Sequence, residues 1–314
     1  MSGGGRREEI RAHLDSTRAQ LEATRAQLEA TNARIEKKAG RNLFLAIGVG
    51  LLLAGVFLGS LLFFDGILFV WFIALLVGVA VVELATAFRV AGRRVPRIGV
   101  VVSGLSMVAA AYFYGAEGLL LSLFAASALL TIWRVVEGLA ARTPVEPKTL
   151  IRDIFSGLFT LVYVPFLGSF AVLLLAVPNG QWWVFALVLV AVSVDIGAYA
   201  AGVTLGKHKM TPRISPNKTW EGFAGAAVAA MVAGVGITVA ALDQPWWVGL
   251  IFGALVLLTA TGGDLTESLI KRDLNVKDMS NWIPGHGGLL DRLDSLLPST
   301  VVAYGLALAL GVLS

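Results

Sequence analysis

The sequence contains no cysteine, and its 314 residues include only three histidines, His13, His208 and His286. Without cysteine, the chain cannot form a disulfide, a thiol nucleophile, a zinc–thiolate site or an iron–sulfur cluster. With so few histidines, any metal site must depend on carboxylates. Charged residues are also scarce, at 15% of the chain, against about 25% in soluble domains. This composition argues against a soluble globular protein, a disordered chain and a nucleic-acid-binding domain.

Apolar sequence is abundant instead, because 57% of the residues are hydrophobic. Nine apolar runs follow one another after residue 42. They lie at about 43–64, 66–88, 98–115, 118–140, 153–177, 182–202, 222–241, 246–263 and 299–313. Runs of about 18 residues or more are typical of membrane-spanning helices. The sequence therefore predicts an all-α, polytopic integral membrane protein with about nine transmembrane helices.

Lysine and arginine occur only at alternate connections between these runs. Nine precede the first run, and four occur in each of the regions 89–97, 134–152, 207–218 and 271–292. The other connections carry Asp65, Glu117, Asn179 and Asp243 but no basic residue. Because cytoplasmic loops collect basic residues, this pattern places the N-terminus in the cytoplasm, and nine spans place the C-terminus outside. We expect a multi-pass protein of the cell membrane (inner or plasma membrane), with the large polar loops 203–221 and 264–298 on the cytoplasmic face.

The first 41 residues differ from the rest of the chain. They are polar and charged, and the phrase TRAQLEA occurs at 17–23 and again at 24–30. Apolar residues recur in this segment with a heptad spacing, at Ile10, Leu14, Leu21, Leu28 and Ile35. The pattern predicts a soluble amphipathic helix, either solvated or part of a short coiled coil. We therefore divide the chain into a polar helix at 1–41 and a multi-span domain at 42–314.

Four acidic residues form two pairs with the same spacing in the last polar loop. Asp264 and Glu267 are three residues apart, as are Asp291 and Asp294, so each pair shares a helix face. Lysines and arginines lie between the pairs, and a GHGG run at 285–288 offers backbone N–H groups to an anion. Carboxylates can hold Mg²⁺ while basic residues neutralise phosphate oxygens. The segment therefore predicts a Mg²⁺–polyphosphate site rather than an ordinary charged loop.

A second polar motif, SPNKTWEG, lies at 215–222. We expect a turn at Ser215 and Pro216, and we expect Thr219 to cap the helix that comes next. Lys218 would then lie near the positive end of that helix, which favours phosphate. The alternative is that Lys218 only sets membrane topology.

Acidic residues also lie within the apolar runs, among them Asp195, Glu83 and Glu137. A carboxylate there is costly and rarely faces lipid, so we expect Asp195 to face a polar cavity, a cation or another helix. Tyr199, four residues later, shares its face. Glu83 and Glu137 are interpreted as structural, with Glu137 able to pair with Arg134, three residues away.

The segment 268–294, which we call the signature segment, resembles the signature of the phosphatidate cytidylyltransferase (CDP-diacylglycerol synthase) family. The matching residues are Ser268, Ile270, Lys271, Arg272, Lys277, Asp278, Ser280, Ile283, Pro284, His286, Gly287, Gly288, Leu289, Asp291, Arg292, Leu293 and Asp294. DIGAY at 195–199 and the SPNKTWEG motif are also similar to blocks of that family. The likeness covers about 195–295 for the motifs and about 43–314 for the multi-span layout; the first 41 residues lie outside it.

The resemblance implies a nucleotidyltransferase that transfers the cytidylyl group of CTP to phosphatidic acid and requires Mg²⁺, with a second cation left open. It places the metal on Asp264 and Asp291, with Asp294 as a third ligand. Lys218, Lys271, Arg272, Lys277 and Arg292 would hold the phosphates of CTP or lipid, and Asp264, Lys271, Asp291 and Arg292 form the catalytic set. A phosphate monoester is largely ionised at pH 7, so no strong base is needed.

The remaining roles are implied by the same resemblance. His286, Gly287 and Gly288 would contact phosphate. For His286, we favour this role over that of a general base. Asp195 would support a second cation or the cytosine amine. The expected partners are CTP, phosphatidic acid and the lipid bilayer, without nucleic acid, and a homodimer is one option for the assembly. The alternatives are a related CTP-dependent membrane enzyme, such as a polyprenol kinase or a CDP-archaeol-type synthase, or a transporter.

Overall fold

The computed structural model describes residues 43–63, 66–141, 145–274, 276, 279–280 and 288–311, without the side chains of 43–47 and 49. The helix predicted over 1–41 lies outside this range. The chain divides into two compact units, and the described part of the first is residues 43–56. Every other described residue belongs to the second unit.

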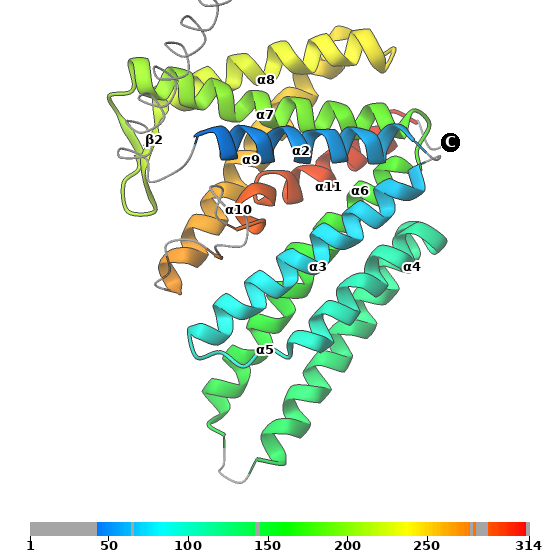
Figure 1. Ribbon diagram of the computed structural model, residues 1–314, viewed down its shortest axis with the longest axis vertical. Helices are drawn as coiled ribbons and strands as arrows, with labels where there is room; N and C mark the ends of the chain where they lie inside the picture. The colour runs from blue at the N-terminus through cyan, green and yellow to red at the C-terminus, as the bar shows by residue number, and fades with distance from the viewer. Residues whose placement is uncertain are drawn as a thin grey trace, which may run out of the picture. The chain divides into compact units, whose positions relative to one another are not determined.

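The described chain is almost entirely helical (Figure 1). The helices are α2 (Leu43–Leu62), α3 (Ile67–Val90), α4 (Arg97–Leu139), α5 (Pro147–Leu161), the π-helical turn η2 (Val162–Phe166), α6 (Leu167–Leu175), α7 (Gly180–Leu205), α8 (Trp220–Ala241), α9 (Trp246–Asp273), α10 (Leu290–Leu293) and α11 (Leu296–Ala309). Two antiparallel strands, β1 (Lys209–Thr211) and β2 (Ser215–Thr219), form a hairpin between α7 and α8. The all-α prediction is confirmed apart from this hairpin.

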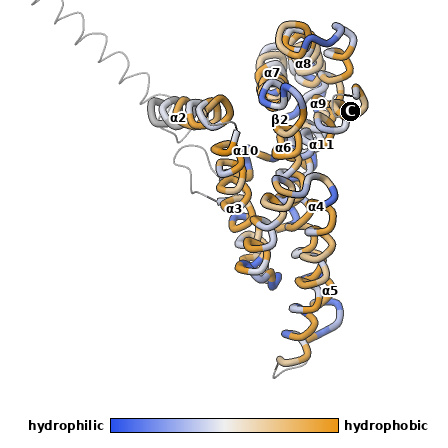
Figure 2. The backbone as a smooth tube through the Cα atoms, turned by 90° about the vertical axis from the view of Figure 1, so that its right-hand side faces the viewer, coloured by the Kyte–Doolittle hydropathy of each residue, from blue (hydrophilic) through white to orange (hydrophobic). Residues whose placement is uncertain are grey.

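Six helical stretches of the described chain are long and apolar enough to cross a membrane, so the protein is a multi-pass membrane protein. They are α3, α4, the continuous stretch from α5 to α6, α7, α8 and α9. Figure 2 shows these helices as mostly hydrophobic. Helix α4 covers two of the predicted runs, and Gly115 interrupts it with φ 65° and ψ −153°. Because only glycine adopts a positive φ readily, this residue separates the two runs without a loop.

Helices α7, α8 and α9 pack in sequence, and α11 lies against both α6 and α9 (Figure 1). Glycine lets α7 and α8 approach closely, because a Cβ on Gly197 would lie 2.6 Å from the carbonyl oxygen of Gly225. Small residues are a common device for helix packing in membranes. This packing brings together the end of α7, the hairpin, the beginning of α8 and the second half of α9.

A buried ion pair ties α4 to α5. The Arg134 Nη2 atom lies 2.7 Å from Asp153 Oδ2, and the two side chains are 1% and 0% exposed. Arg134 also pairs with Glu137 at 2.6 Å, as the spacing predicted. Asp153 accepts the backbone N–H of Arg94 at 3.0 Å, which holds the connection between α3 and α4. One charge network therefore fixes three segments.

We expect Arg134→Met to lower the free energy of unfolding by about 3 kcal/mol, because it leaves Asp153 as an uncompensated buried charge. Unfolding in mixed detergent micelles with increasing dodecyl sulfate would measure the change. Arg97→Gln, at an exposed position on the same helix, is the control and should have little effect. Equal stability of the two variants would contradict the assignment.

Candidate active site

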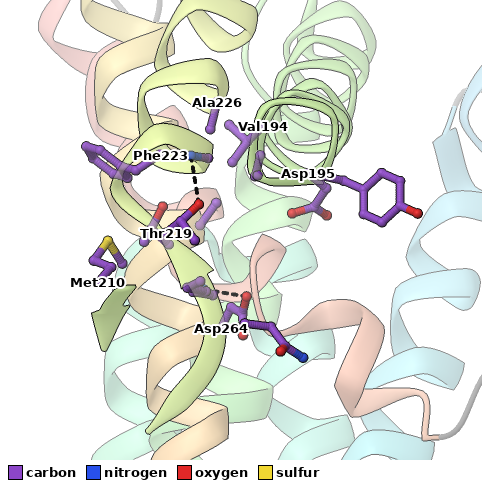
Figure 3. Close-up of a pocket in the computed structure, with 15 residues that line it drawn as sticks. Val194, Asp195, Met210, Thr219, Phe223, Ala226 and Asp264 are labelled. Carbon is purple, nitrogen blue, oxygen red and sulfur yellow. Dashed lines mark hydrogen bonds and ion pairs between the residues drawn. The ribbon is translucent and has the colours of Figure 1, made fainter. Parts of the chain in front are cut away.

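A pocket of about 260 Å³ opens between α7, the hairpin, α8 and α9 (Figure 3). Its polar lining includes Asp195, Tyr199, Asn217, Lys218, Thr219 and Asp264. Asp195 and Tyr199 line the same cavity, as their spacing predicted. The pocket therefore joins the SPNKTWEG motif to the beginning of the last polar segment.

An ion pair spans this pocket. Lys218 Nζ lies 2.5 Å from Asp264 Oδ2, and both side chains are partly exposed. The Thr219 hydroxyl accepts the N–H of Gly222 at 3.1 Å, so the predicted helix cap is confirmed. Lys218 consequently lies at the N-terminal end of α8, where backbone N–H groups favour an anion. The turn predicted at Ser215 and Pro216 is wrong, because both residues lie in β2 and residues 212–214 make the turn.

A second group of charges, which we call the Lys271 cluster, consists of Glu267, Lys271 and Asp291. Lys271 Nζ lies 3.1 Å from Asp291 Oδ1 and 3.4 Å from Glu267 Oε2. Glu267 is buried, at 1% exposure. Glu267 has no predicted role beyond its spacing from Asp264, although its position four residues before Lys271 indicates an ion pair.

Helix packing brings the two predicted carboxylate pairs to one place. A Cβ on Gly263 would lie 2.0 Å from the Asp294 carbonyl oxygen, so α9 directly contacts the backbone just before α11. Asp294 lies close enough to Asp264 and Glu267 for their charges to interact. The Tyr163 hydroxyl, from η2, donates to the Gly263 carbonyl at 3.4 Å on the same stretch of α9.

Asp291 and Asp294 have different electrostatic environments. Burial opposes ionisation of Asp291, but hydrogen bonds with Glu267 and the Gly288 N–H, together with the Lys271 charge, hold its pKa below the ordinary value. Burial raises the pKa of Asp294 and outweighs its hydrogen bonds from Ser295. Asp291 is thus the better-stabilised anion of the two.

Asp195 connects the pocket to Arg292 and Asp294, which follow Asp291 in the sequence. It lies within electrostatic range of Asp264, Asp294, Lys218 and Arg292. The structure therefore gathers seven of the predicted site residues in one region: Asp195, Lys218, Asp264, Lys271, Asp291, Arg292 and Asp294.

The other predicted site residues lie elsewhere or outside the described range. Arg272 Nε donates to the Ile214 carbonyl at 3.4 Å, so this side chain ties α9 to the hairpin. The N–H of Gly288 donates to Asp291 Oδ2 at 2.9 Å and is therefore engaged within the loop, rather than free for an anion as predicted. Lys277, His286 and Gly287 lie outside the described residues.

The donor chemistry of this region fits a hard cation such as Mg²⁺. Glu267 Oε1 is buried and has no hydrogen-bond partner among the described residues, while the carboxyl groups of Asp291 and Asp294 adjoin it. A buried unpaired oxygen beside other carboxyl oxygens suits a metal that prefers oxygen ligands. Within the described part of the chain, no three His, Asp or Glu side chains are arranged as a finished metal site. Instead, Lys218 pairs with Asp264, and Lys271 bridges Glu267 and Asp291.

Comparison with known proteins gives a consistent result. The model of the cytidylyltransferase family matches residues 44–310. A phosphatidate cytidylyltransferase of Mycobacterium leprae is 40% identical over 275 residues, covering 85% of this chain and 88% of the relative. The enzyme of the same name from Mycobacterium tuberculosis is 38% identical over 272 residues, covering 85% and 83%. That of Bacillus subtilis is 47% identical over 119 residues, covering 38% and 44%.

Proposed function

The chain belongs to the cytidylyltransferase family, and we propose that its reaction, the transfer of the cytidylyl group of CTP to phosphatidic acid, takes place between the Lys218–Asp264 pair and the Lys271 cluster. The products are CDP-diacylglycerol and pyrophosphate, which makes the protein an enzyme of phospholipid synthesis. The observation that supports this location is that Asp294 interacts with both groups, with Asp264 of the first and with Glu267 of the second, and that the first group lines an open pocket.

The residues of the site are suited to joining two anionic substrates. An oxygen of the lipid phosphate attacks the α-phosphorus of CTP, and the bond to the β-phosphate breaks as pyrophosphate leaves. The ammonium groups of Lys218 and Lys271 each carry three N–H donors. Pairing with one or two carboxylates therefore leaves donors for phosphate oxygens, and Arg292 adds a further positive charge. Because the attacking phosphate is already ionised near pH 7, the carboxylates need not act as bases.

Asp264 and Asp291 would hold Mg²⁺, with Asp294 as a third ligand and Glu267 beside them. When bound, the ion supplies positive charge against the leaving pyrophosphate. Asp195, on the other side of the pocket, could hold a second cation or the cytosine amine. Lys218 holds Asp264 in place, and Lys271 holds Asp291 in place.

For the membrane arrangement, we propose nine crossings, with the N-terminus and the site on the cytoplasmic face, where CTP is available. The alternation of basic residues supports this topology. Two further statements stay predictions. One is the division of the chain into a polar helix at 1–41 and a catalytic domain at 42–314, and the other is a homodimeric assembly.

Acceptor choice tests the proposed chemistry. We expect purified protein in detergent, given labelled CTP and Mg²⁺, to form a labelled CDP-lipid from phosphatidic acid and none from a polyprenol. A polyprenol offers a hydroxyl group, which needs a base that this mechanism does not provide. Chelation of Mg²⁺ should stop the reaction, and its return should restore it. Labelling of the polyprenol by γ-labelled CTP, with phosphatidic acid inert, would contradict the proposal.

A further inference from the structure

Glu83 is a buried carboxylate in the middle of an apolar helix. It lies in α3 and is 1% exposed. An ionisable group at such a position is expensive, so it normally has a partner. The sequence alone predicts a structural role for Glu83 and indicates no partner.

The partners of Glu83 are donors from the signature segment, about two hundred residues away. Its Oε1 atom accepts the Ser280 hydroxyl at 2.5 Å and the Leu289 N–H at 3.0 Å, and its Oε2 atom accepts the Leu290 N–H at 2.8 Å. Ser280 and Leu289 lie on either side of residues 281–288. The carboxylate therefore holds these two parts of the signature segment, at Ser280 and at Leu289, at one point.

The same stretch of backbone also binds Asp291. Three consecutive N–H groups are divided between two carboxylates, with Gly288 donating to Asp291 and Leu289 and Leu290 donating to Glu83. A Cβ on Gly288 would lie 3.0 Å from Asp291 Oδ2 and 3.2 Å from Glu83 Oε2. Glu83 and Asp291 thus pack on the same glycine, and the orientation of its backbone affects both.

We infer that Glu83 is a positioning residue for the reaction. It fixes the backbone of residues 288–290, and that backbone holds the Asp291 carboxylate facing Lys271, where the carboxylate would bind the ion. This inference rests on the proposed function. A glutamine cannot replace Glu83 fully, because its amide NH₂ would face N–H or O–H donors where an acceptor is needed.

We expect Glu83→Gln to raise the Mg²⁺ concentration for half-maximal activity by about tenfold, since it removes a charge-assisted buried hydrogen bond. Saturating Mg²⁺ should restore most of kcat. Hydrogen exchange of the Leu289 and Leu290 amides, measured without Mg²⁺, should accelerate by about the same factor. The matched control is Glu137→Gln, another glutamate of a membrane helix that pairs with Arg134. It should change neither quantity.

The outcomes separate the inference from the proposed function. A wild-type protein that makes no CDP-lipid would contradict the function, whereas the exchange of the two amides would still test the contact. Unchanged Mg²⁺ dependence and unchanged exchange in Glu83→Gln would overturn the inference, whatever the total activity. If Glu83→Gln does not fold, Ser280→Ala replaces it, because that variant removes one donor and keeps the carboxylate. It should shift both quantities in the same direction by a smaller factor, and the absence of any shift would again overturn the inference.

Discussion

Asp291→Asn should reduce the rate of CDP-diacylglycerol formation by on the order of 10³-fold or more, equivalent to several kcal/mol of transition-state stabilisation. Asparagine keeps the shape of the side chain but loses the charge that pairs with Lys271 and that would hold Mg²⁺. It also weakens the bond from the Gly288 N–H, because a neutral oxygen is a poorer acceptor than a carboxylate. The measurement is kcat with labelled CTP at saturating lipid.

The control for this variant is Asp273→Asn. Asp273 is the last residue of α9, its side chain is 63% exposed, and it pairs with Arg93 away from the pocket. Exposed ion pairs contribute little, so its activity should stay within about twofold of the wild type. If Asp291→Asn retained comparable activity while eluting as a folded protein, Asp291 could not be an essential metal ligand.

Lys218→Gln should reduce kcat/KM for CTP by about 10² to 10³-fold, the usual effect of losing one preorganised donor to a developing anion. Lys218 pairs with Asp264 at 2.5 Å, and it lies at the N-terminal end of α8. Its loss would remove the phosphate contact that we propose, and it leaves Asp264 without the neutralising ammonium group.

Lys209→Gln is the matched control, since Lys209 is an exposed lysine on β1 of the same hairpin. This variant removes one positive charge from the same hairpin, as Lys218→Gln does, but Lys209 does not line the pocket. The two variants should therefore differ by at least about tenfold. If both variants reduced kcat/KM only slightly and to the same extent, the result would favour the simpler interpretation, in which Lys218 only sets membrane topology.

Local sequence patterns were sufficient to predict the helices and one of the caps. Seven of the nine apolar runs correspond to α3 through α9, because lipid-facing and buried positions of a membrane helix are both apolar. Thr219 was identifiable as a cap from its residue type and its place before an apolar run. The hairpin could not be predicted, because β1 and β2 are short and polar. Pro216 also argues against a strand, although a two-stranded sheet consists only of edges and tolerates it.

The site was predictable only where its residues are close in sequence. The spacing of Asp264 and Glu267, and that of Asp291 and Asp294, indicated two paired carboxylates. Their meeting depends on the close approach of Gly263 to the Asp294 backbone, which is a property of packing between distant helices. The role of Glu83 left no local signal at all, since two of its three donors are backbone amides far along the chain.

The position of the label in the product tests the proposed reaction most directly. CTP labelled at the α-phosphate and CTP labelled at the γ-phosphate would be given separately to the wild type and to Asp291→Asn, with phosphatidic acid and Mg²⁺. We predict that the wild type passes the α-label to the lipid and releases the γ-label as pyrophosphate, and that Asp291→Asn does neither. Transfer of the γ-label to lipid, with release of CDP, would show a kinase and would contradict cytidylyl transfer at this site.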